Sequence, residues 1–535
     1  MADSLFTRRD VLSGVGAAVV GAMAPLGGAR AGNAPAESAR AKTSTSMSRP
    51  NIVFFMPDEL RADAVGCYGN SVVKTPHFDE LARQGARFQN CHVQYPICTQ
   101  SRCSMLTGWP TSVRGHRSMM YMLRPYEPNM FRYLIEAGYD VFWFGKNDAL
   151  SQDSFTRSAT YWKERPPWDT NIRSLTPGIT SFLYKGGEDV RQDADYPPVH
   201  NGLQILERRE TDRPFFLFLA LSDPHPPYRA PHGFDGMYDP DALPPLIPPD
   251  LPKKPSFHRR FRETAGLTRA TDRVFREVRA TYYGMISYSD WLLGQVLETL
   301  ERTGRSKDTA VFMASDHGDY AGDFGLVEKW ASGQEHCVTR VPLIARVPGC
   351  PSGVVTEELI ELYDIMPTML ELAGTRPAHT NFARSLLPQL KGGAGDPDRA
   401  AFSEGGYNIY EPQCFEPIPP VKADPYWARH TVENKEPQTV SRVASVKTKR
   451  YNYVMRPEGI SELYDLADDP QEKNNLIDES THRHVREALH KRLLQWYVDT
   501  SGVAPNNKDA RGMPPYDPMA KPVSTPGERE KLLDL

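Results

Sequence analysis

The chain contains 535 residues, with 63 Lys and Arg against 67 Asp and Glu, so that its formal net charge is −4. This near balance argues against a protein whose whole surface binds nucleic acid or a membrane. The hydrophobic fraction of 40% and the charged fraction of 24% are those of an ordinary globular protein. A basic stretch at 253–279 is a local exception, either a solvated helix face or a cationic collar around an anionic substrate.

The N-terminus has the pattern of an export signal. Arg8 and Arg9 precede an apolar run rich in Gly and Ala, and a small-x-small cleavage motif ends at Ala31. This pattern predicts a twin-arginine signal peptide over residues 1–31 and a mature protein in the periplasm or outside the cell. The apolar run is short and interrupted by a proline, so we expect no stable membrane insertion after cleavage. Residues 32–48 are predicted to form a disordered leader.

Five continuous apolar runs, separated by helical patterns, follow along the chain. Such runs are typical of strands that are buried on both faces. Strands alternating with helices predict an α/β fold with a large, mostly parallel sheet and helices on both faces. We expect this catalytic domain to span 49–400. The predicted strands are 51–56, 141–144, 215–220, 309–314 and 343–347.

The pattern changes near residue 400. Alternating residues at 441–447 indicate an antiparallel strand, with 451–455 as its partner, and a further strand is expected at 462–466. A helix is predicted at 481–497. We interpret 401–505 as a smaller C-terminal α+β subdomain, followed by a polar, proline-rich tail at 506–535.

Polar side chains with metal-binding chemistry follow two of the predicted strands. Asp58 and Glu59 come just after the first, and Asp316 and His317 come just after 309–314. Ligands of open α/β sheets bind at the carboxyl ends of the strands. Carboxylate and imidazole groups at such ends suit a divalent cation. Acidic residues also occur there because they stabilise turns.

Cys98 and Arg102 form a second candidate group. A helix that begins near residue 101 would place Cys98 at its N-terminal end, where the helix dipole and free N–H groups favour an anion. A nucleophile, a cation and a helix N-terminus suit phosphoryl or sulfuryl transfer. Lys146, His225 and Lys329 also lie near predicted strand ends. Each alone has a plainer interpretation as a packing or surface residue.

Together these pieces resemble the formylglycine-dependent, type I sulfatase family of the alkaline phosphatase superfamily. The segment Asn-Ile-Val-Phe-Phe-Met-Pro-Asp ending at Asp58 is similar to its first strand and metal-binding aspartate. Cys-Thr-Gln-Ser-Arg from Cys98, with Leu-Thr-Gly ending at Gly108, is similar to the signature sequence. Gly-Lys at Lys146 and Ser-Asp-His-Gly ending at Gly318 resemble two further motifs. The motifs occur in the expected order across most of the mature chain.

The resemblance implies hydrolysis of a sulfate ester to an alcohol or phenol and inorganic sulfate. It also implies that a formylglycine-generating enzyme oxidises Cys98 to formylglycine, whose hydrate attacks sulfur. The cofactor would be Ca²⁺, with Mg²⁺ or Mn²⁺ as alternatives. The ligands carried over from the family are Asp58, Glu59, Cys98, Asp316 and His317.

The resemblance assigns roles to the remaining cations and to one histidine. Arg102, Lys146 and Lys329 would offset charge on the sulfuryl oxygens, and His225 would protonate the leaving oxygen. The substrate would be a small-molecule or carbohydrate sulfate ester. Its specificity is expected in three loop regions, at 150–205, 226–280 and 405–435.

Two positions depart from the family pattern. Gln100 stands where the signature usually has Pro, which bears on how well Cys98 is modified. The family's Lys-x-His is Lys-x-Asp here, so that Asp148 or His116 would have to serve as the general base. This gap resembles phosphonate monoester and phosphodiester hydrolases of the same superfamily, which form the alternative function. A third reading is a catalytically inactive binding protein.

Overall fold

The computed structural model describes residues 49–165, 176, 179, 183–184, 187 and 189–504. They all lie in one compact unit, Ser48–Leu535. The predicted signal peptide, leader and tail, at 1–31, 32–48 and 506–535, lie outside the described residues. Among the helices of the described residues, none combines the length and the apolar character needed to cross a bilayer.

The large sheet has eight strands in the order β4-β3-β5-β1-β6-β7-β2-β8. Seven strands are parallel, and β7 runs antiparallel to both of its neighbours, β6 and β2. This confirms the predicted fold class. The strands are β1 (Asn51–Met56), β2 (Ala86–His92), β3 (Asp140–Gly145), β4 (Tyr161–Glu164), β5 (Phe215–Ala220), β6 (Thr309–Ala314), β7 (Arg340–Arg346) and β8 (Val354–Glu361).

Side chains of the central strands alternate between two hydrophobic cores, one on each face of the sheet. In β1, Val53 and Phe55 belong to one core, and Ile52 and Phe54 belong to the other. Because both faces are covered, such strands consist of continuous apolar residues, and β1, β5 and β6 coincide with their predicted ranges. The strands β4 and β8 form the two edges of the sheet, carry exposed polar residues and were not predicted.

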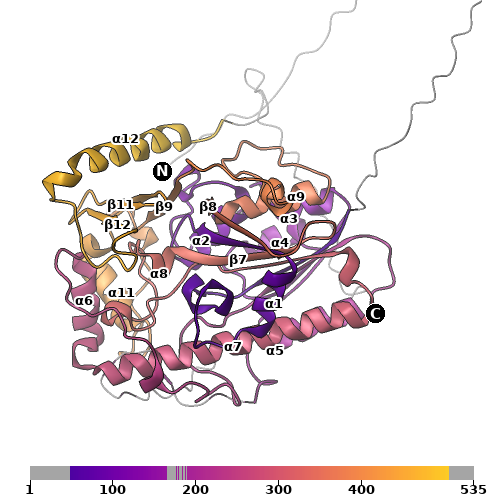
Figure 1. The fold of residues 1–535 in the computed structure, drawn as a ribbon, viewed down its shortest axis with the longest axis horizontal. Helices are drawn as coiled ribbons and strands as arrows, with labels where there is room; N and C mark the ends of the chain where they lie inside the picture. Colours follow the sequence, from indigo (N-terminus) through magenta and orange to yellow (C-terminus); the bar gives the residue numbers. More distant parts are fainter. Residues whose placement is uncertain are drawn as a thin grey trace, which may run out of the picture. The chain divides into compact units, whose positions relative to one another are not determined.

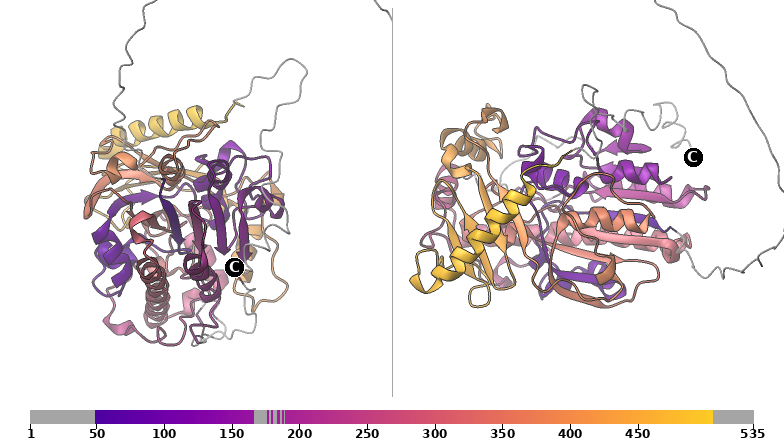
Figure 2. Two further views of the ribbon diagram at one scale, coloured as in Figure 1. Left: turned by 90° about the vertical axis from the view of Figure 1, so that its right-hand side faces the viewer. Right: turned by 90° about the horizontal axis from the view of Figure 1, so that it is seen from above.

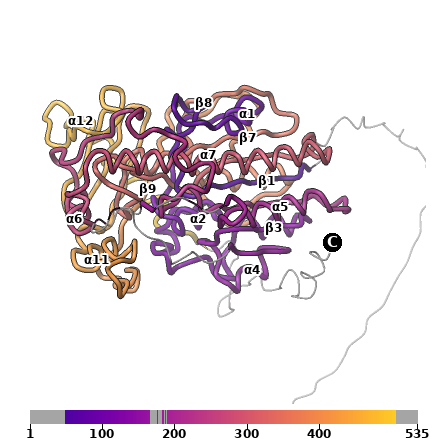
Figure 3. Tube along the Cα trace, turned by 90° about the horizontal axis from the view of Figure 1, so that it is seen from below, coloured from indigo at the N-terminus to yellow at the C-terminus, as the bar shows by residue number. Residues whose placement is uncertain are grey.

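Helices cover both faces of this sheet (Figure 1). The core that contains Val53 includes residues of α1, α5 and α7, and Figure 3 shows α7 running beside α5. The core that contains Ile52 includes residues of α2, α3, α4 and α9. The helices are α1 (Pro76–Gln84), α2 (Cys98–Thr107), α3 (Met130–Glu136), α4 (Gln152–Ser158), α5 (Tyr196–Arg208), α6 (Ser256–Ala265), α7 (Asp272–Arg302), α8 (His336–Thr339), α9 (Ile365–Leu372), α10 (Leu387–Leu390), α11 (Trp427–Lys435) and α12 (Arg483–Thr500).

A second, antiparallel sheet has the order β12-β11-β10-β9. Its strands are β9 (Ala401–Gly405), β10 (Val443–Lys447), β11 (Tyr451–Met455) and β12 (Glu462–Asp465). The helix α12 crosses this sheet (Figure 2) and buries Leu493 and Trp496 in a third core with Val446 and Leu463. The three predicted strands and the helix are thus present, and β9 is an additional strand.

The basic stretch at 253–279 forms α6 and the first turns of α7. Its arginines pair with nearby carboxylates: Arg260 with Glu263 at 3.2 Å and Arg262 with Asp250 at 2.6 Å. Because these pairs neutralise much of the charge, they favour the solvated helix face over a cationic collar.

Gly145, the last residue of β3, has no room for a side chain. A Cβ atom there would lie 1.9 Å from the carbonyl oxygen of Ala220 on β5, and its φ is +107°. We expect Gly145→Ala to lower the free energy of unfolding by about 2–5 kcal/mol, the sum of backbone strain and overpacking. Urea unfolding measures this loss. Gly138→Ala is the matched control, because φ is +87° but nothing lies within 4 Å. Equal losses in the two variants would contradict the steric argument.

Candidate active site

The carboxyl ends of β1 and β6 bring two acidic motifs together. These strands are parallel neighbours, so Asp58 and Asp316, each two residues past its strand, meet at the same edge of the sheet. The backbone N–H of Glu59 donates to Asp316 Oδ1 at 3.1 Å. All three side chains are fully buried. Glu59 adopts a φ of +68°, which is rare for a residue with a side chain.

Cys98 lies beside these carboxylates, and we call the group around Asp58, Cys98, Asp316 and His317 the acidic corner. The helix α2 begins at Cys98 itself, earlier than the predicted start near residue 101, so that Cys98 occupies its N-terminal end as expected. Its Sγ lies 3.1 Å from His317 Nε2 and 3.6 Å from Asp58 Oδ1. One ligand atom from each of Asp58, Cys98, Asp316 and His317 lies within 4.8 Å of all the others. The structure therefore brings together four of the five predicted metal ligands in one group.

The tautomer of His317 follows from its surroundings. Its Nδ1 lies 3.0 Å from the carbonyl oxygen of Gly318, which can only accept a hydrogen bond. Nδ1 therefore carries the proton of the neutral ring, and the lone pair of Nε2 faces Cys98. Burial lowers the pKa of His317, which favours this neutral form. The ring is thus oriented as a nitrogen ligand.

Glu59, the fifth predicted ligand, adds a further oxygen donor. Its Oε2 is 2.8 Å from Lys329 Nζ, whereas its Oε1 is buried and has no hydrogen-bond partner among the described residues. Burial raises the pKa of Glu59 even though Lys329 is adjacent. A buried carboxylate oxygen normally has a partner. The donor set of carboxylates, one imidazole and position 98 fits a hard divalent cation.

Two predicted cations hold the acidic corner together. Arg102 Nη2 lies 2.5 Å from Asp58 Oδ2, and its Nε lies 2.7 Å from Asp316 Oδ2, so one guanidinium bridges the two strand ends. Lys146 Nζ is 2.8 Å from Asp58 Oδ2 and 3.5 Å from Cys98 Sγ. Burial opposes ionisation of Asp58, but Lys146 and Arg102 together hold its pKa well below the usual value.

Lys329 and His225 form a second pair at the site. Their Nζ and Nε2 atoms are 2.6 Å apart, and His225 Nδ1 faces the carbonyl oxygen of Pro226. Because that carbonyl accepts from Nδ1, His225 Nε2 accepts from Lys329. Burial, Lys146 and Lys329 lower the pKa of His225, so the imidazole is neutral.

The two candidates for the general base differ in their surroundings. Asp148 Oδ2 is 3.1 Å from Lys146 Nζ, at the edge of the site. His116 instead contacts the carbonyl of Tyr121 through Nδ1 at 2.7 Å and Glu127 through Nε2 at 3.1 Å. Both partners are acceptors, so both ring nitrogens carry protons. Although burial opposes it, contacts with Cys103 and Glu127 raise the pKa of His116 accordingly.

A pocket of about 530 Å³ opens beside Lys146. Part of the pocket wall comes from β4 and the residue that follows it. Because β4 is a short strand at the edge of the sheet, it showed no clear pattern in the sequence, and Glu164 and Arg165 were not predicted as site residues. The polar pocket residues Asp148 and Gln152 fall within or beside the region expected to set specificity. Its described lining consists of Met122, Gly145, Lys146, Asn147, Asp148, Leu150, Gln152, Glu164 and Arg165.

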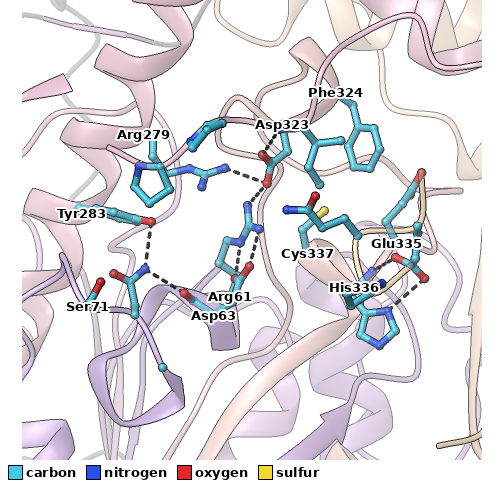
Figure 4. Close-up of a pocket in the computed structure, with 18 residues that line it drawn as sticks. Arg61, Asp63, Ser71, Arg279, Tyr283, Asp323, Phe324, Glu335, His336 and Cys337 are labelled. Atoms are coloured by element: carbon cyan, nitrogen blue, oxygen red, sulfur yellow. Dashed lines mark hydrogen bonds and ion pairs between the residues drawn. The ribbon is translucent and has the colours of Figure 1, made fainter. Parts of the chain in front are cut away.

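A separate pocket of about 260 Å³ contains none of the predicted site residues (Figure 4). Its charges are paired internally: Arg61 lies 2.8 Å from Asp323, and Arg279 lies 2.8 Å from the same carboxylate. Arg61 also donates to the carbonyl oxygens of Asp319 and Tyr320. This network supports the loop that follows β6.

Comparison with known proteins identifies the family to which the chain belongs. The family model described as Sulfatase matches residues 50–375, which is more than half of the chain. The chain belongs to the sulfatase family. A second model, N-sulphoglucosamine sulphohydrolase C-terminal, matches residues 419–499. Membership confirms the predicted enzyme class, a sulfuric ester hydrolase, and the superfamily.

Curated relatives cover most of this sulfatase. An arylsulfatase of Clostridium perfringens is 25% identical over 508 residues, covering 87% of this chain and 98% of the relative. An ulvan-active sulfatase of Formosa agariphila is 27% identical over 467 residues, covering 83% and 80%.

Solved structures show the same fold. Phosphonate monoester hydrolase of Agrobacterium radiobacter has a TM-score of 0.68 and 23% identity, covering 84% of this chain and 96% of its own. A protein solved with its substrate D-glucosamine-2-N,6-O-disulfate has a TM-score of 0.67 and 18% identity, covering 86% and 100%. At such identities the likeness concerns the fold alone.

The bridging role of Arg102 makes a prediction about stability. In metal-free protein, Arg102→Ala leaves Asp58 and Asp316 buried without their shared cation, which should cost about 3–5 kcal/mol of unfolding free energy. Urea unfolding in the presence of a chelator measures this loss. Arg83→Ala, which removes an exposed arginine paired with Glu80, should leave stability close to that of the wild type. An Arg102→Ala variant as stable as this control would contradict the bridging role.

Proposed function

We propose that this sulfatase hydrolyses a sulfate monoester, using a formylglycine made from Cys98 beside a bound divalent ion. The observation that carries the proposal is the convergence of Cys98 with Asp58, Asp316 and His317 within 4.8 Å. A nucleophile at a helix N-terminus, next to a metal-binding corner and buried cations, suits attack on an anionic ester.

Asp58, Glu59, Asp316, His317 and position 98 would hold the ion. Oxygen-rich coordination favours Ca²⁺, with Mg²⁺ or Mn²⁺ as alternatives. When present, the ion and the aldehyde hydrate supply a polarised sulfuryl group and an oxygen nucleophile. Formation of the aldehyde requires a formylglycine-generating enzyme, and Gln100 lies within the sequence that this enzyme would read.

The cations of the site bind and orient the sulfate group. Lys146 contacts Cys98 directly, and Arg102 contacts Asp58 next to it. Lys329 contacts Glu59 and His225. These groups are fixed by buried ion pairs before substrate arrives. They therefore stabilise charge on the sulfuryl oxygens without reorganisation.

Protons move through the two pairs at the edges of the site. The leaving oxygen would receive its proton from the pair formed by Lys329 and His225, whose Nζ and Nε2 atoms share a hydrogen bond of 2.6 Å. The shared proton is on the Lys329 ammonium, so His225 Nε2 can deliver a proton only after taking it from Lys329. Asp148 accepts a proton from the nucleophile and is held in place by Lys146. Asp148 is favoured over His116 because a doubly protonated imidazole has no lone pair to accept a proton.

A comparison of two substrate classes tests this function. Protein produced with a formylglycine-generating enzyme should release sulfate from an aryl sulfate faster than it cleaves an aryl phosphonate. Cys98→Ala should lower the rate by at least 1000-fold, in line with the loss of a covalent nucleophile, while the circular dichroism spectrum stays unchanged.

Two results would replace the proposal with its alternatives. A phosphonate rate that exceeds the sulfate rate by orders of magnitude would favour the phosphonate monoester hydrolase activity. An intact thiol at Cys98 in every molecule, detected by peptide mass spectrometry, together with no turnover would favour an inactive binding protein.

The pocket beside Lys146 is proposed to hold the leaving alcohol. Its polar lining combines the acceptors Asp148 and Glu164, the donors Lys146 and Arg165, and the amides Asn147 and Gln152, and its described part contains no aromatic ring. Saccharide hydroxyls, which both donate and accept hydrogen bonds, match such a lining better than a flat aryl group does. A volume of about 530 Å³ is in the range of ligand sites.

Substitution of Glu164 tests the leaving-group pocket. Glu164→Ala should lower kcat/KM for a sulfated saccharide by roughly 3–10-fold, the value of one lost hydrogen bond, and leave the rate on a small aryl sulfate unchanged. Lys163→Ala on the same strand is the control, because Lys163 does not line the pocket. An equal effect of Glu164→Ala on both substrates would rule out a role in recognising the alcohol.

Export by the twin-arginine route, with cleavage after Ala31, remains part of the proposal. This route carries folded proteins, so oxidation of Cys98 and metal loading would take place before export to the periplasm or the exterior.

A further inference from the structure

Three acidic side chains form a second cluster that shares no residue with the proposed ion site. Asp193, Asp195 and Asp223 each offer one carboxylate oxygen, and these oxygens lie within 4.8 Å of one another. Asp195 immediately precedes α5, and Asp223 lies three residues past β5. The cluster therefore joins the start of a helix to the loop that carries His225.

Asp195 is fixed by backbone groups of that loop. Its carboxylate accepts from the N–H of Ser222 at 2.8 Å and from the N–H of Asp223 at 2.7 Å, and its side chain is fully buried. The backbone N–H of Asp195 in turn donates to Asp193 Oδ1 at 2.9 Å. Two carboxylates of the cluster are thus held in position by the fold.

Asp223 provides an independent observation. Its side chain is 6% exposed, and its Oδ2 is buried without a hydrogen-bond partner among the residues that the structure describes. An oxygen of this carboxylate nevertheless lies within 4.8 Å of the other two acids. Buried polar atoms without partners are rare and need a reason, such as a ligand. Here the carboxyl group of Asp223 lies in a cluster with two further acids.

The charge balance points to a cation. Arg165 and Arg229 face the cluster and lower the pKa of Asp223, but burial and the two neighbouring acids outweigh them and raise it overall. Three ionised carboxylates at these separations repel one another strongly in a buried environment. A divalent ion, added to the two arginines, would compensate the charge that remains.

We propose that Asp193, Asp195 and Asp223 bind a second divalent cation. The ligands are oxygens without nitrogen or sulfur, which selects a hard ion of the calcium type. The ion would brace the loop between β5 and His225. The same loop reaches the first site, because the N–H of Asp58 donates to the carbonyl oxygen of Asp223 at 3.2 Å.

Counting bound ions tests this site without reference to turnover. The mature protein is equilibrated with Ca²⁺ by dialysis, and the metal content per chain is measured by mass spectrometry. We expect two ions in the wild type and one in Asp223→Asn. Asp223→Asn is conservative in size and shape, and it removes the negative charge that the ion would compensate. Asp193→Asn should show the same loss and replaces it if the first variant fails to fold.

Two controls separate this site from the first. Asp316→Asn should lose the ion at Asp58 and keep the second, so this variant should also bind one ion. Asp212 is an exposed acid in the loop before β5, so Asp212→Asn should bind two ions. If Asp223→Asn and Asp193→Asn bind as many ions as the wild type, shared protons and not a metal compensate the cluster, and the proposal fails. An Asp316→Asn variant that binds as much as the wild type would instead count against the first site.

Discussion

The compensation of buried charge by Arg102 is the constraint on which the active-site corner depends. Asp58, Glu59 and Asp316 are fully buried, and three cations, Arg102, Lys146 and Lys329, lie against them. Counted as ionised, these three acids and three cations carry equal and opposite charge, and Asp148 and Glu328 place further carboxylates beside Lys146 and Lys329. Lys146 and Lys329 each contact one of the carboxylates, whereas Arg102 spans two strand ends. Its planar guanidinium contacts Asp58 and Asp316 through different nitrogen atoms, which the single ammonium nitrogen of a lysine could not do in the same way.

This balance also explains how the corner can serve chemistry. A bound divalent cation would add positive charge to this corner, and a sulfate monoester carries one negative charge, so the occupied site would attract the anionic ester. The polar groups are oriented by the sheet and by α2 before any ligand arrives. Such preorganisation is what electrostatic catalysis requires, because no folding free energy is then spent on orienting dipoles during the reaction.

Much of the fold and of this corner was predictable from the sequence. The central strands are apolar throughout because both faces are covered, and acids directly after them must lie at one edge of a parallel sheet. That reasoning placed Asp58 and Asp316 together. A helix was expected to begin near residue 101 with Cys98 at its N-terminal end, and the motif resemblance added Lys146, His225 and Lys329 to the site.

Other features were not accessible from the sequence, for physical reasons. The edge strands β4 and β8 mix polar and apolar residues, since one side of each faces solvent, so neither periodicity nor an apolar run marked them. The protonation of His116 depends on two acceptors, Tyr121 and Glu127, which only the folded loop brings to its ring. The Asp193, Asp195 and Asp223 cluster combines two chain segments whose acids individually resemble ordinary turn residues.

The backbone of Glu59 carries a further consequence. This residue occupies a conformation that glycine adopts easily, and Tyr282 on α7 secures it by donating to its carbonyl oxygen at 2.7 Å while accepting the N–H of Arg61 at 3.1 Å. Strain of this kind persists where surrounding structure enforces it. Selection for heat resistance would favour glycine here, whereas selection for turnover retains the carboxylate. Because the Tyr282 hydroxyl contacts backbone groups of this turn, the support from α7 does not depend on which side chain stands at position 59.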